Sequence, residues 1–305
     1  MITILGPTAT GKTALAARLA YDLNGEVISA DSRQVYRGMD IGTGKDYDDY
    51  VVNGTAVPYH LIDILEPGYE YNIYEYQKDF LKAYHGIMSR GKLPVLCGGS
   101  GMYLEAVLKG YMLARSEEDN EFLSALEHKT MDQLIEILKS FKAPHNITDL
   151  EERPRLLKAI TVARAATTTS SAERFPEINS VNFGISFPRG LVKSRIFSRL
   201  ESRLENGMIA EVQKLLDSGI TPDRLMKYGL EYKFVTLYLT GSLSGSGMFD
   251  SLNIAIRQFA KRQMTWYRRM EKQGINIHWI DGRLPMEEKI EEIKEILNKI
   301  LCQSL

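Results

Sequence analysis

Short apolar runs alternate with segments of helical periodicity along the first hundred residues of the chain. The apolar runs predict buried strands at residues 2–5, 26–30, 59–64 and 93–97. Apolar residues at helical spacing predict helices around residues 15–23, 79–90 and 102–108. Because strands and helices alternate, the pattern predicts a parallel sheet with helices on both faces.

Helical periodicity replaces this pattern between residues 112 and 179. Helices are expected at residues 121–126, 131–141 and 150–166, followed by a polar loop at residues 167–171. A strand is then predicted at residues 181–187, so the chain returns to the sheet. We therefore expect one α/β core, formed by residues 1–111 and 180–305, that carries a helical insert at residues 112–179.

The returning part of the core is expected to be mainly helical. Long helices are predicted at residues 195–216 and 252–272, and a Gly/Ser-rich turn at residues 241–247. On the second helix, Arg257, Lys261 and Arg268 fall near one face. Five apolar residues fall on another face, namely Leu252, Ile256, Phe259, Trp266 and Met270.

Composition limits the classes of protein that fit. The 305 residues include only two cysteines, Cys97 and Cys302, which favours a reducing compartment over a disulfide framework. The first strand follows Met1 with no basic leader, and no run approaches the ~20 apolar residues of a membrane span. A cytoplasmic protein without a membrane partner, and a monomer, is expected. Because the net charge is −1, binding to nucleic acid would need a local basic surface.

A phosphate-binding loop follows the first strand and opens the first helix. It consists of Gly6, Pro7, Thr8, Ala9, Thr10, Gly11, Lys12 and Thr13, which fit the P-loop pattern found in ATP-binding and other nucleotide-binding proteins. Its backbone N–H groups and the helix N-terminus attract phosphate, Lys12 adds a full charge, and the Thr13 hydroxyl can bind Mg²⁺. Kinases, NTPases and transferases that consume a diphosphate all need such a loop, so the motif alone leaves the ligand open.

A second segment, residues 30–45, begins where the second strand ends. Asp31 opens it, beside the P-loop in the crevice where parallel sheets bind ligands. A carboxylate there can accept a proton or hold Mg²⁺, although an isolated Asp at a strand end is more often a capping residue.

The two segments together resemble the tRNA dimethylallyltransferase family, also called tRNA isopentenyltransferases. The family carries a G-P-T-[AG]-[ST]-G-K-[ST] loop and then D-S-x-Q-[VI]-Y-[RK]-G-[ML]-D-I-G-T-[AG]-K, and this chain matches both. Further matching segments are residues 58–64, 98–104, 207–215 and 257–268. The resemblance extends over roughly residues 2–270.

The resemblance implies a role for each matching residue. Lys12, the rest of the P-loop and Arg199 would bind the diphosphate of dimethylallyl diphosphate, with Thr13 on Mg²⁺. Catalysis would rest on Asp31, Ser100, Lys12 and Arg195. Contacts with the tRNA anticodon stem-loop would come from Asp31, Ser32, Arg33, Gln34, Ser100, Arg155, Lys158, Tyr228, Gly229, Arg257 and Lys261. Arg195 and Arg199 lie one turn apart, as a diphosphate clamp requires.

The reaction implied is transfer of a dimethylallyl group to N6 of adenosine 37, in tRNAs that read codons beginning with U. The adenine would be flipped out of its loop, and Asp31 would orient its amine and accept a proton. Two departures from the family are expected to matter. Residues 228–233 differ from the family's Gly-Tyr-[KR]-[EQ] segment, and the helix that starts near Glu152 contains an unusual proline, Pro154.

Three other functions remain open at this stage. A small-molecule or nucleoside kinase would share the P-loop and sheet, and an adenylate prenyltransferase would use a free nucleotide. A non-catalytic RNA-binding module would use the basic surfaces without needing the P-loop or Asp31. The helical insert and the basic second helix favour a large RNA substrate over a free nucleotide.

Overall fold

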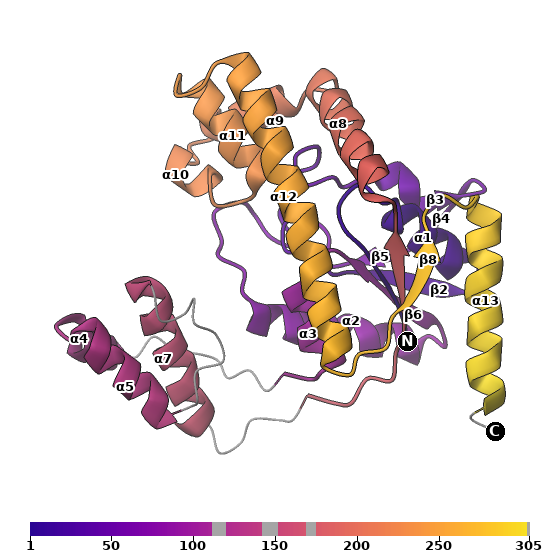
Figure 1. The fold of residues 1–305 in the computed structure, drawn as a ribbon, viewed down its shortest axis with the longest axis horizontal. Coiled ribbons are helices and arrows are strands. Elements are labelled where there is room, and N and C mark those ends of the chain that lie inside the picture. Colours follow the sequence, from indigo (N-terminus) through magenta and orange to yellow (C-terminus); the bar gives the residue numbers. More distant parts are fainter. Residues whose placement is uncertain (112–119, 142–151, 169–174, 304–305) are drawn as a thin grey trace. The chain divides into compact units, whose positions relative to one another are not determined.

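The chain folds into two units, which this computed structural model describes over residues 1–111, 120–141, 152–168 and 175–303. Unit 1 comprises Met1–Leu108 and Ile178–Leu305, and unit 2 comprises Lys109–Glu177 (Figure 1). The sequence predicts the insert at residues 112–179. Within the described ranges, no helix combines the length and the apolar character needed to cross a bilayer.

Unit 1 is built on a parallel sheet. Its described strands are β1 (Ile2–Leu5), β2 (Gly25–Ser29), β5 (Tyr59–His60), β6 (Leu93–Gly98), β7 (Val181–Ser186) and β8 (His278–Asp281). Their order is β5-β2-β6-β1-β7-β8, and β1 pairs with β6 on one side and β7 on the other. The predicted α/β fold with a parallel sheet is therefore confirmed, while β8 is an addition that the sequence pattern did not indicate.

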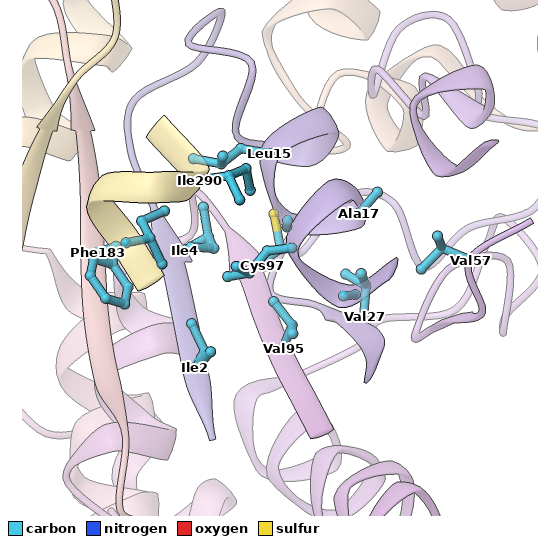
Figure 2. Close-up of a cluster of buried hydrophobic side chains, with 14 of the residues drawn as sticks. Ile2, Ile4, Leu15, Ala17, Val27, Val57, Val95, Cys97, Phe183 and Ile290 are labelled. Atoms are coloured by element: carbon cyan, nitrogen blue, oxygen red, sulfur yellow. The ribbon is translucent and has the colours of Figure 1, made fainter. Parts of the chain in front are cut away.

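Helices cover both faces of this sheet. On one face, α1 (Lys12–Asp22) and α13 (Met286–Gln303) pack over Ile4, Val95 and Phe183 through Leu15 and Ile290 (Figure 2). The neighbouring strand residues, whose side chains point to the opposite face of the sheet, are buried too; examples are Thr3, Leu5 and Leu96. The other helices close to the sheet are α2 (Ile73–Ser89) and α3 (Gly101–Leu108), and α2 packs on β2 and β6.

A second hydrophobic core joins the C-terminal helices to the loop that follows β2. These helices are α8 (Arg189–Glu205), α9 (Met208–Asp217), α10 (Pro222–Leu225), α11 (Leu230–Leu239) and α12 (Gly245–Lys272). Val35, Tyr36 and Met39 from the loop are buried among them. The helices thus hold the segment that begins with Asp31.

Several predicted element boundaries are wrong for identifiable reasons. The single helix expected at residues 195–216 is two helices, because Gly207 adopts φ 97°, a conformation that glycine reaches at little cost. Helix α2 begins six residues earlier than expected, where Asn72 forms a capping box with Glu75. The expected strand at residues 59–64 stops at His60, because Leu61 and Asp63 have positive φ.

The start of α12 also differs from the prediction. Ser244 caps the helix by accepting a hydrogen bond from the Gly247 N–H, so α12 begins at Gly245, inside the expected Gly/Ser-rich turn. A small hairpin, β3 (Val51–Val52) and β4 (Thr55–Ala56), follows the short 3₁₀ helix η1 (Tyr47–Tyr50). Neither the helix nor the hairpin was indicated by the sequence pattern.

Unit 2 has its own apolar core. Its described helices are α4 (Asn120–Glu127), α5 (Met131–Phe141) and α7 (Arg153–Thr168), which pack through residues such as Leu134, Leu138 and Leu156. Pro154 lies in the first turn of α7, where a backbone N–H is not needed, so the unusual proline is compatible with the helix. Residues 167–168 continue α7 rather than beginning the expected polar loop, and residues 169–171 lie outside the described ranges.

Candidate active site

A large cavity opens in unit 1 at the carboxyl ends of β1, β2 and β6. Its volume is about 1020 Å³, and it is lined by residues 8–13 of the P-loop, residues 31–34, 42–44, 46 and 49–50, and residues 97–103. Helices α8 and α12 and the segment 226–233 complete the wall. The cavity therefore brings together sequence segments that lie more than 200 residues apart.

The P-loop forms one side of the cavity, and α1 begins directly after it. Gly11 precedes the first helical residue with φ 76°, and the Thr10 hydroxyl donates to the Pro7 carbonyl at 2.9 Å. Gly6 and Pro7 do not line the cavity and act through their carbonyl groups, while the residues from Thr8 to Thr13 do line it. The backbone is thus shaped as a phosphate-binding loop requires.

Lys12 lies within this loop, with Nζ 3.4 Å from the Pro7 carbonyl oxygen. Burial lowers the pKa of Lys12, and the nearby Arg199 lowers it further. An anionic ligand would oppose both effects, since oxyanions stabilise the ammonium form. The site therefore favours phosphate oxygens beside Lys12.

The two predicted arginines of α8 approach the same loop. Arg195 Nε donates to the Ala9 carbonyl at 2.7 Å, and its guanidinium lies over the Phe187 ring. Arg199 contacts the Thr8 hydroxyl at 3.4 Å and forms an ion pair with Asp46 at 3.0 Å. Both arginines line the cavity, so the structure brings the predicted diphosphate clamp to the P-loop.

Asp31 and its neighbours form the facing edge of the cavity. Oδ1 of Asp31 accepts a hydrogen bond from the Arg33 N–H at 2.9 Å, so the carboxylate shapes its own turn. The Ser32 N–H donates to Oγ of Ser100 at 3.1 Å. Asp31, Ser32, Arg33 and Ser100 all line the cavity, as the sequence predicts for residues that contact substrate.

Gln34 differs from these residues because its amide is already used inside the protein. It accepts a hydrogen bond from the Ser29 hydroxyl at 3.0 Å and donates to the Gly44 carbonyl at 3.0 Å. Only 9% of Gln34 is exposed. Gln34 thus helps to hold the loop and also lines the cavity, so its expected contact with tRNA stays a prediction.

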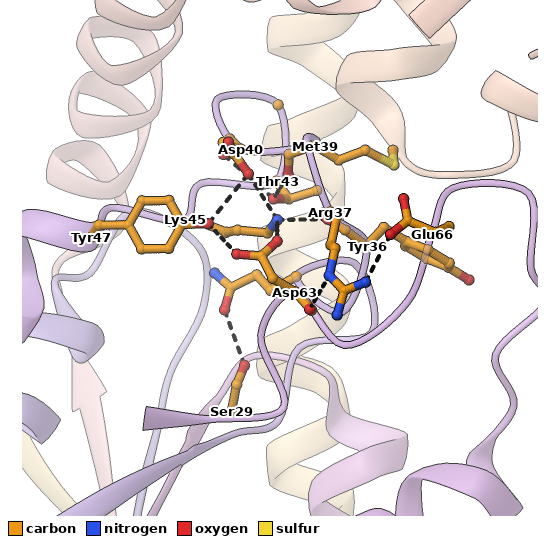
Figure 3. Close-up of polar contacts among 12 residues, drawn as sticks. Ser29, Tyr36, Arg37, Met39, Asp40, Thr43, Lys45, Tyr47, Asp63 and Glu66 are labelled. Atoms are coloured by element: carbon orange, nitrogen blue, oxygen red, sulfur yellow. Dashed lines mark hydrogen bonds and ion pairs between the residues drawn. The ribbon is translucent and has the colours of Figure 1, made fainter. Parts of the chain in front are cut away.

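Charged residues fix the rest of the loop, residues 35–45. The buried Lys45 ammonium donates to the Tyr36 carbonyl at 2.6 Å and forms ion pairs with Asp40 and Asp63, as Figure 3 shows. Glu211 of α9 accepts three backbone N–H groups, from Asp40, Ile41 and Gly42. The sequence pointed to Glu211 as part of a motif but gave no role for it.

Helix α12 forms hydrogen bonds with the P-loop and with Gly99. Gln263 accepts a hydrogen bond from the Thr8 N–H at 2.9 Å and donates to the Gly99 carbonyl at 2.8 Å. The Tyr267 hydroxyl lies 3.0 Å from the Gly6 carbonyl oxygen and 3.1 Å from that of Gly99. The matching segment 257–268 therefore positions the phosphate-binding loops, a role that helical periodicity alone could not reveal.

The outer face of α12 is separate from the cavity. Arg257 and Lys261 do not line it, and Arg257 Nε donates to the Asn253 carbonyl at 3.3 Å. Phe259, from the apolar face of α12, is 38% exposed and lines the cavity. Ile256, Gln263 and Trp266 line it as well, so this face of α12 borders the open site.

The remaining predicted tRNA contacts lie in two places. Tyr228 and Gly229 line the cavity, but Tyr228 is 4% exposed and its hydroxyl oxygen accepts the Gly68 N–H at 2.5 Å. Arg155 lies in α7 of unit 2 and forms an ion pair with Glu152 at 3.1 Å. Lys158 also belongs to α7, and its side chain is outside the described part of the structure.

The cavity concentrates positive charge in a protein whose net charge is −1. Eight basic residues line it, namely Lys12, Arg33, Arg195, Arg199, Arg203, Lys227, Lys233 and Arg262. Four acidic residues line it, namely Asp31, Asp46, Asp49 and Glu231. The excess of cations makes the cavity suited to a polyanionic ligand.

Comparison with known sequences decides which P-loop family this site represents. The IPP transferase family pattern matches residues 34–270, and the isopentenyl transferase pattern matches residues 1–63. The chain belongs to the IPP transferase family. Its family motifs therefore correspond to the loops that line the cavity and to the residues of α12 that hold them.

Individual relatives cover nearly the whole chain. A protein of Bacteroides fragilis named tRNA dimethylallyltransferase 2 is 53% identical over 300 residues, which cover 98% of each chain. The crystal structure of a tRNA isopentenylpyrophosphate transferase from Bacillus halodurans is 32% identical with a TM-score of 0.70, covering 99% of this chain and 96% of that chain. A eukaryotic dimethylallyltransferase structure shares the fold at 22% identity and a TM-score of 0.76, covering 92% of this chain and 73% of that one.

Proposed function

We propose that this chain is a tRNA dimethylallyltransferase, which transfers the dimethylallyl group of dimethylallyl diphosphate to N6 of adenosine 37. The observation that carries the proposal is one cavity that is lined both by Asp31 and by a P-loop that Arg195 and Arg199 contact. A carboxylate close to a phosphate-binding loop can accept the proton of the N6 amine near the point where the diphosphate leaves. The family membership of the chain supports the same assignment.

The reaction requires two bond changes and one proton transfer. The allylic C–O bond to the diphosphate breaks, a bond forms between that carbon and N6, and N6 loses a proton. The P-loop amides, Lys12 and the two arginines stabilise the charge that develops on the diphosphate. Asp31 orients the amine and accepts the proton, because the lone pair of N6 is otherwise delocalised into the adenine ring.

Mg²⁺ is compatible with the oxygen donors of this cavity. Thr13, Asp46 and Asp49 line it, and Mg²⁺ binds through one or two protein oxygens together with phosphate oxygens and water. The Thr13 hydroxyl would hold the ion against the diphosphate. Bound there, Mg²⁺ would neutralise charge on the departing diphosphate.

The acceptor is proposed to be the anticodon loop of tRNAs that read codons beginning with U. The cationic lining of the cavity fits an RNA backbone, and a loop base can be extruded at lower cost than a paired one. We place the activity in the cytoplasm, where these tRNAs are used, and propose that the monomer acts alone. We also propose that tRNA is contacted by Arg155 and Lys158 of unit 2 and by Arg257 and Lys261 of α12.

Nucleoside analysis tests the assignment directly. The purified protein is incubated with dimethylallyl diphosphate, Mg²⁺ and an anticodon stem-loop that carries adenosine 37, and the digested RNA is analysed for N6-isopentenyladenosine. A control stem-loop with guanosine at position 37 should remain unmodified. Transfer to free AMP but not to the stem-loop would identify an adenylate prenyltransferase, and transfer of the γ-phosphate of labelled ATP would identify a kinase.

A further inference from the structure

Helix α8 carries a further arginine that lines the cavity, Arg203, one turn beyond Arg199. Its side chain is 12% exposed, compared with 30% for Arg199. Nη1 of Arg203 lies 3.5 Å from a carboxylate oxygen of Glu231, whose side chain is 19% exposed. Within the described ranges, the buried Nη2 atom has no hydrogen-bond partner. A buried guanidinium with one ionic partner is costly to maintain, so its retention calls for an explanation.

Arg195, Arg199 and Arg203 make different contacts along the cavity wall. Arg195 and Arg199 reach the P-loop, at the Ala9 carbonyl and the Thr8 hydroxyl. Arg203 reaches Glu231 on α11, and its Nη2 packs against Gly44, where there is no room for a Cβ atom and φ is +69°; Nη2 of Arg199 approaches the same glycine. Arg203 therefore links the loop at Gly44 to Glu231 of α11.

Both partners of Arg203 belong to the side of the cavity that would receive the nucleoside. Gly44 is in the loop that begins with Asp31, and its carbonyl accepts the hydrogen bond from Gln34. Glu231 lies in the segment 226–233, which contributes seven residues to the cavity wall, all of that segment except Tyr232. Arg203 is thus in contact with the loop that carries the proposed base and with the wall beside it.

We infer that Arg203 is a positioning residue for the acceptor nucleoside, which it serves by holding the Asp31 loop and the 226–233 wall together through Gly44 and Glu231. The inference rests on the proposed function. It gives Arg203 a role in shaping the RNA side of the site, in addition to the diphosphate contacts proposed for Arg195 and Arg199. Its proposed contribution is geometric and acts through Gly44 and Glu231, although the Arg203 side chain also lines the cavity.

The electrostatic surroundings of Glu231 provide a specific test of this role. Burial raises the pKa of Glu231, while Arg203, and more weakly Arg199, lower it. Asp31, on the facing loop, raises it, and Tyr232 is the neighbouring titratable group on α11. The residue of α12 that borders this pair is Ile256, which is apolar. Without Arg203, Glu231 would be a buried carboxylate that is stable in place only when protonated.

The test compares Arg203→Met, Arg203→Lys, and the double variant Arg203→Met/Glu231→Gln with the wild type. Arg203→Met should lower kcat/KM for the anticodon stem-loop by about 10²-fold, the size expected for a small displacement of reacting groups, while the Kd for dimethylallyl diphosphate stays within about twofold. The loss should deepen as pH rises, since Glu231 then becomes charged and unpaired. Arg203→Lys should recover part of the loss, and the double variant should show no added pH dependence relative to wild type.

Arg189→Met, which removes an exposed arginine at the start of α8, is the matched control and should leave both the diphosphate affinity and the pH profile unchanged. Equal loss of diphosphate and stem-loop binding in Arg203→Met would overturn the inference. So would a loss in Arg203→Met that is independent of pH, or one that follows the fraction of unfolded protein in a thermal scan. Failure of the wild type to modify any stem-loop would instead contradict the proposed function.

Discussion

Asp31 combines two duties at the scale of a single residue. One carboxylate oxygen accepts the Arg33 N–H, and Asp31 also lines the cavity that the P-loop borders. The hydrogen bond fixes the turn, so the carboxylate is held in place before substrate arrives. Such preorganisation is what general-base catalysis requires.

Replacing Asp31 by Asn separates these duties. Asn retains the oxygen that caps the turn but cannot take a proton, so the single-turnover rate on pre-bound stem-loop should fall by about 10²–10⁴-fold. Binding of both substrates should change little. If the rate stays near normal, Asp31 is a capping residue only. If the loss is in diphosphate affinity and high Mg²⁺ restores it, the carboxylate holds the metal.

Lys12 provides the corresponding test on the diphosphate side. Lys12→Ala removes a cation that lies in the P-loop and outside the apolar core, so the chain should fold normally. The affinity for dimethylallyl diphosphate, measured by calorimetry, should fall by at least about tenfold, as loss of a charge-assisted contact implies. Unchanged turnover at both limiting and saturating diphosphate would remove Lys12 from the mechanism.

Glu26 carries a pH dependence that is independent of catalysis. Burial alone would raise the pKa of this carboxylate, but hydrogen bonds from Arg90 and His60 outweigh that effect and lower it to about 2. A lowered pKa stabilises the folded state above the unfolded value near 4.5, and the contribution is lost as pH falls toward 2. Glu26→Gln should therefore cost roughly 2–3 kcal/mol at pH 7.

The difference in unfolding free energy between wild type and Glu26→Gln should shrink between pH 5 and pH 3. Urea titrations at fixed pH values measure it. Glu66→Gln, which removes an exposed partner of Arg37, is the control and should change stability by less than about 1 kcal/mol at every pH. A pH-independent cost for Glu26→Gln would show that packing, rather than charge, makes Glu26 important.

At the scale of secondary-structure elements, α12 acts as a brace for the catalytic loops. Gln263 and Tyr267 lie one turn apart and bind backbone groups of Gly6, Thr8 and Gly99. The helix thereby ties the ends of β1 and β6 together. The phosphate-binding geometry depends on a helix that follows the P-loop by about 250 residues in the sequence.

Removing the amide of Gln263 should disturb this brace. Gln263→Met leaves the Thr8 N–H unpaired, at a cost of about 1–3 kcal/mol, and leaves the Gly99 carbonyl with the Tyr267 hydroxyl alone. We expect weaker binding of dimethylallyl diphosphate together with a lower melting temperature. Gln258→Met, at an exposed position of the same helix, should leave both unchanged. Equal behaviour of the two variants would show that the P-loop is held by its own contacts.

The elements that could be predicted from sequence are those with a local signal. Continuous apolar runs predicted β1, β2, β6 and β7. The P-loop pattern also predicted the strand before it, β1, and the helix after it, α1. The element boundaries at Gly207 and Leu61 depend on the φ angle of a single residue. They could not be predicted, because apolar periodicity carries no information about φ. The roles of Gln263, Glu211 and Arg203 escaped as well, since each depends on a partner more than 20 residues away in the chain.

At the scale of the whole molecule, we assign the proposed chemistry to unit 1 and the proposed binding of the RNA stem to unit 2. Among the residues that the structure describes, those that line the cavity all belong to unit 1, while unit 2 has a separate apolar core around Leu134 and Leu156. The proposed chemistry therefore needs only unit 1. Unit 2 is available for binding the stem of the RNA, as the sequence predicts for residues 112–179.

Deleting the insert tests this division. Replacing residues 109–177 by a short Gly/Ser linker should abolish binding to the anticodon stem-loop, measured by gel shift, and spare dimethylallyl diphosphate binding. The diphosphate measurement is the control for folding of unit 1. If stem-loop affinity survives the replacement, unit 2 serves another purpose and the RNA is recognised by unit 1 alone.

The position of β1 in the sheet has a consequence for biogenesis. β1 is made first, yet it lies between β6 and β7, so its second neighbour leaves the ribosome only after some 180 residues have been added. The contacts within unit 2 join residues that are close in sequence, so unit 2 can fold before β7 is available to pair with β1. Clamping of the P-loop comes later again, when α12 has been synthesised. The P-loop is thus synthesised well before the helix that holds it, and the cavity can be completed only after α12 has been made.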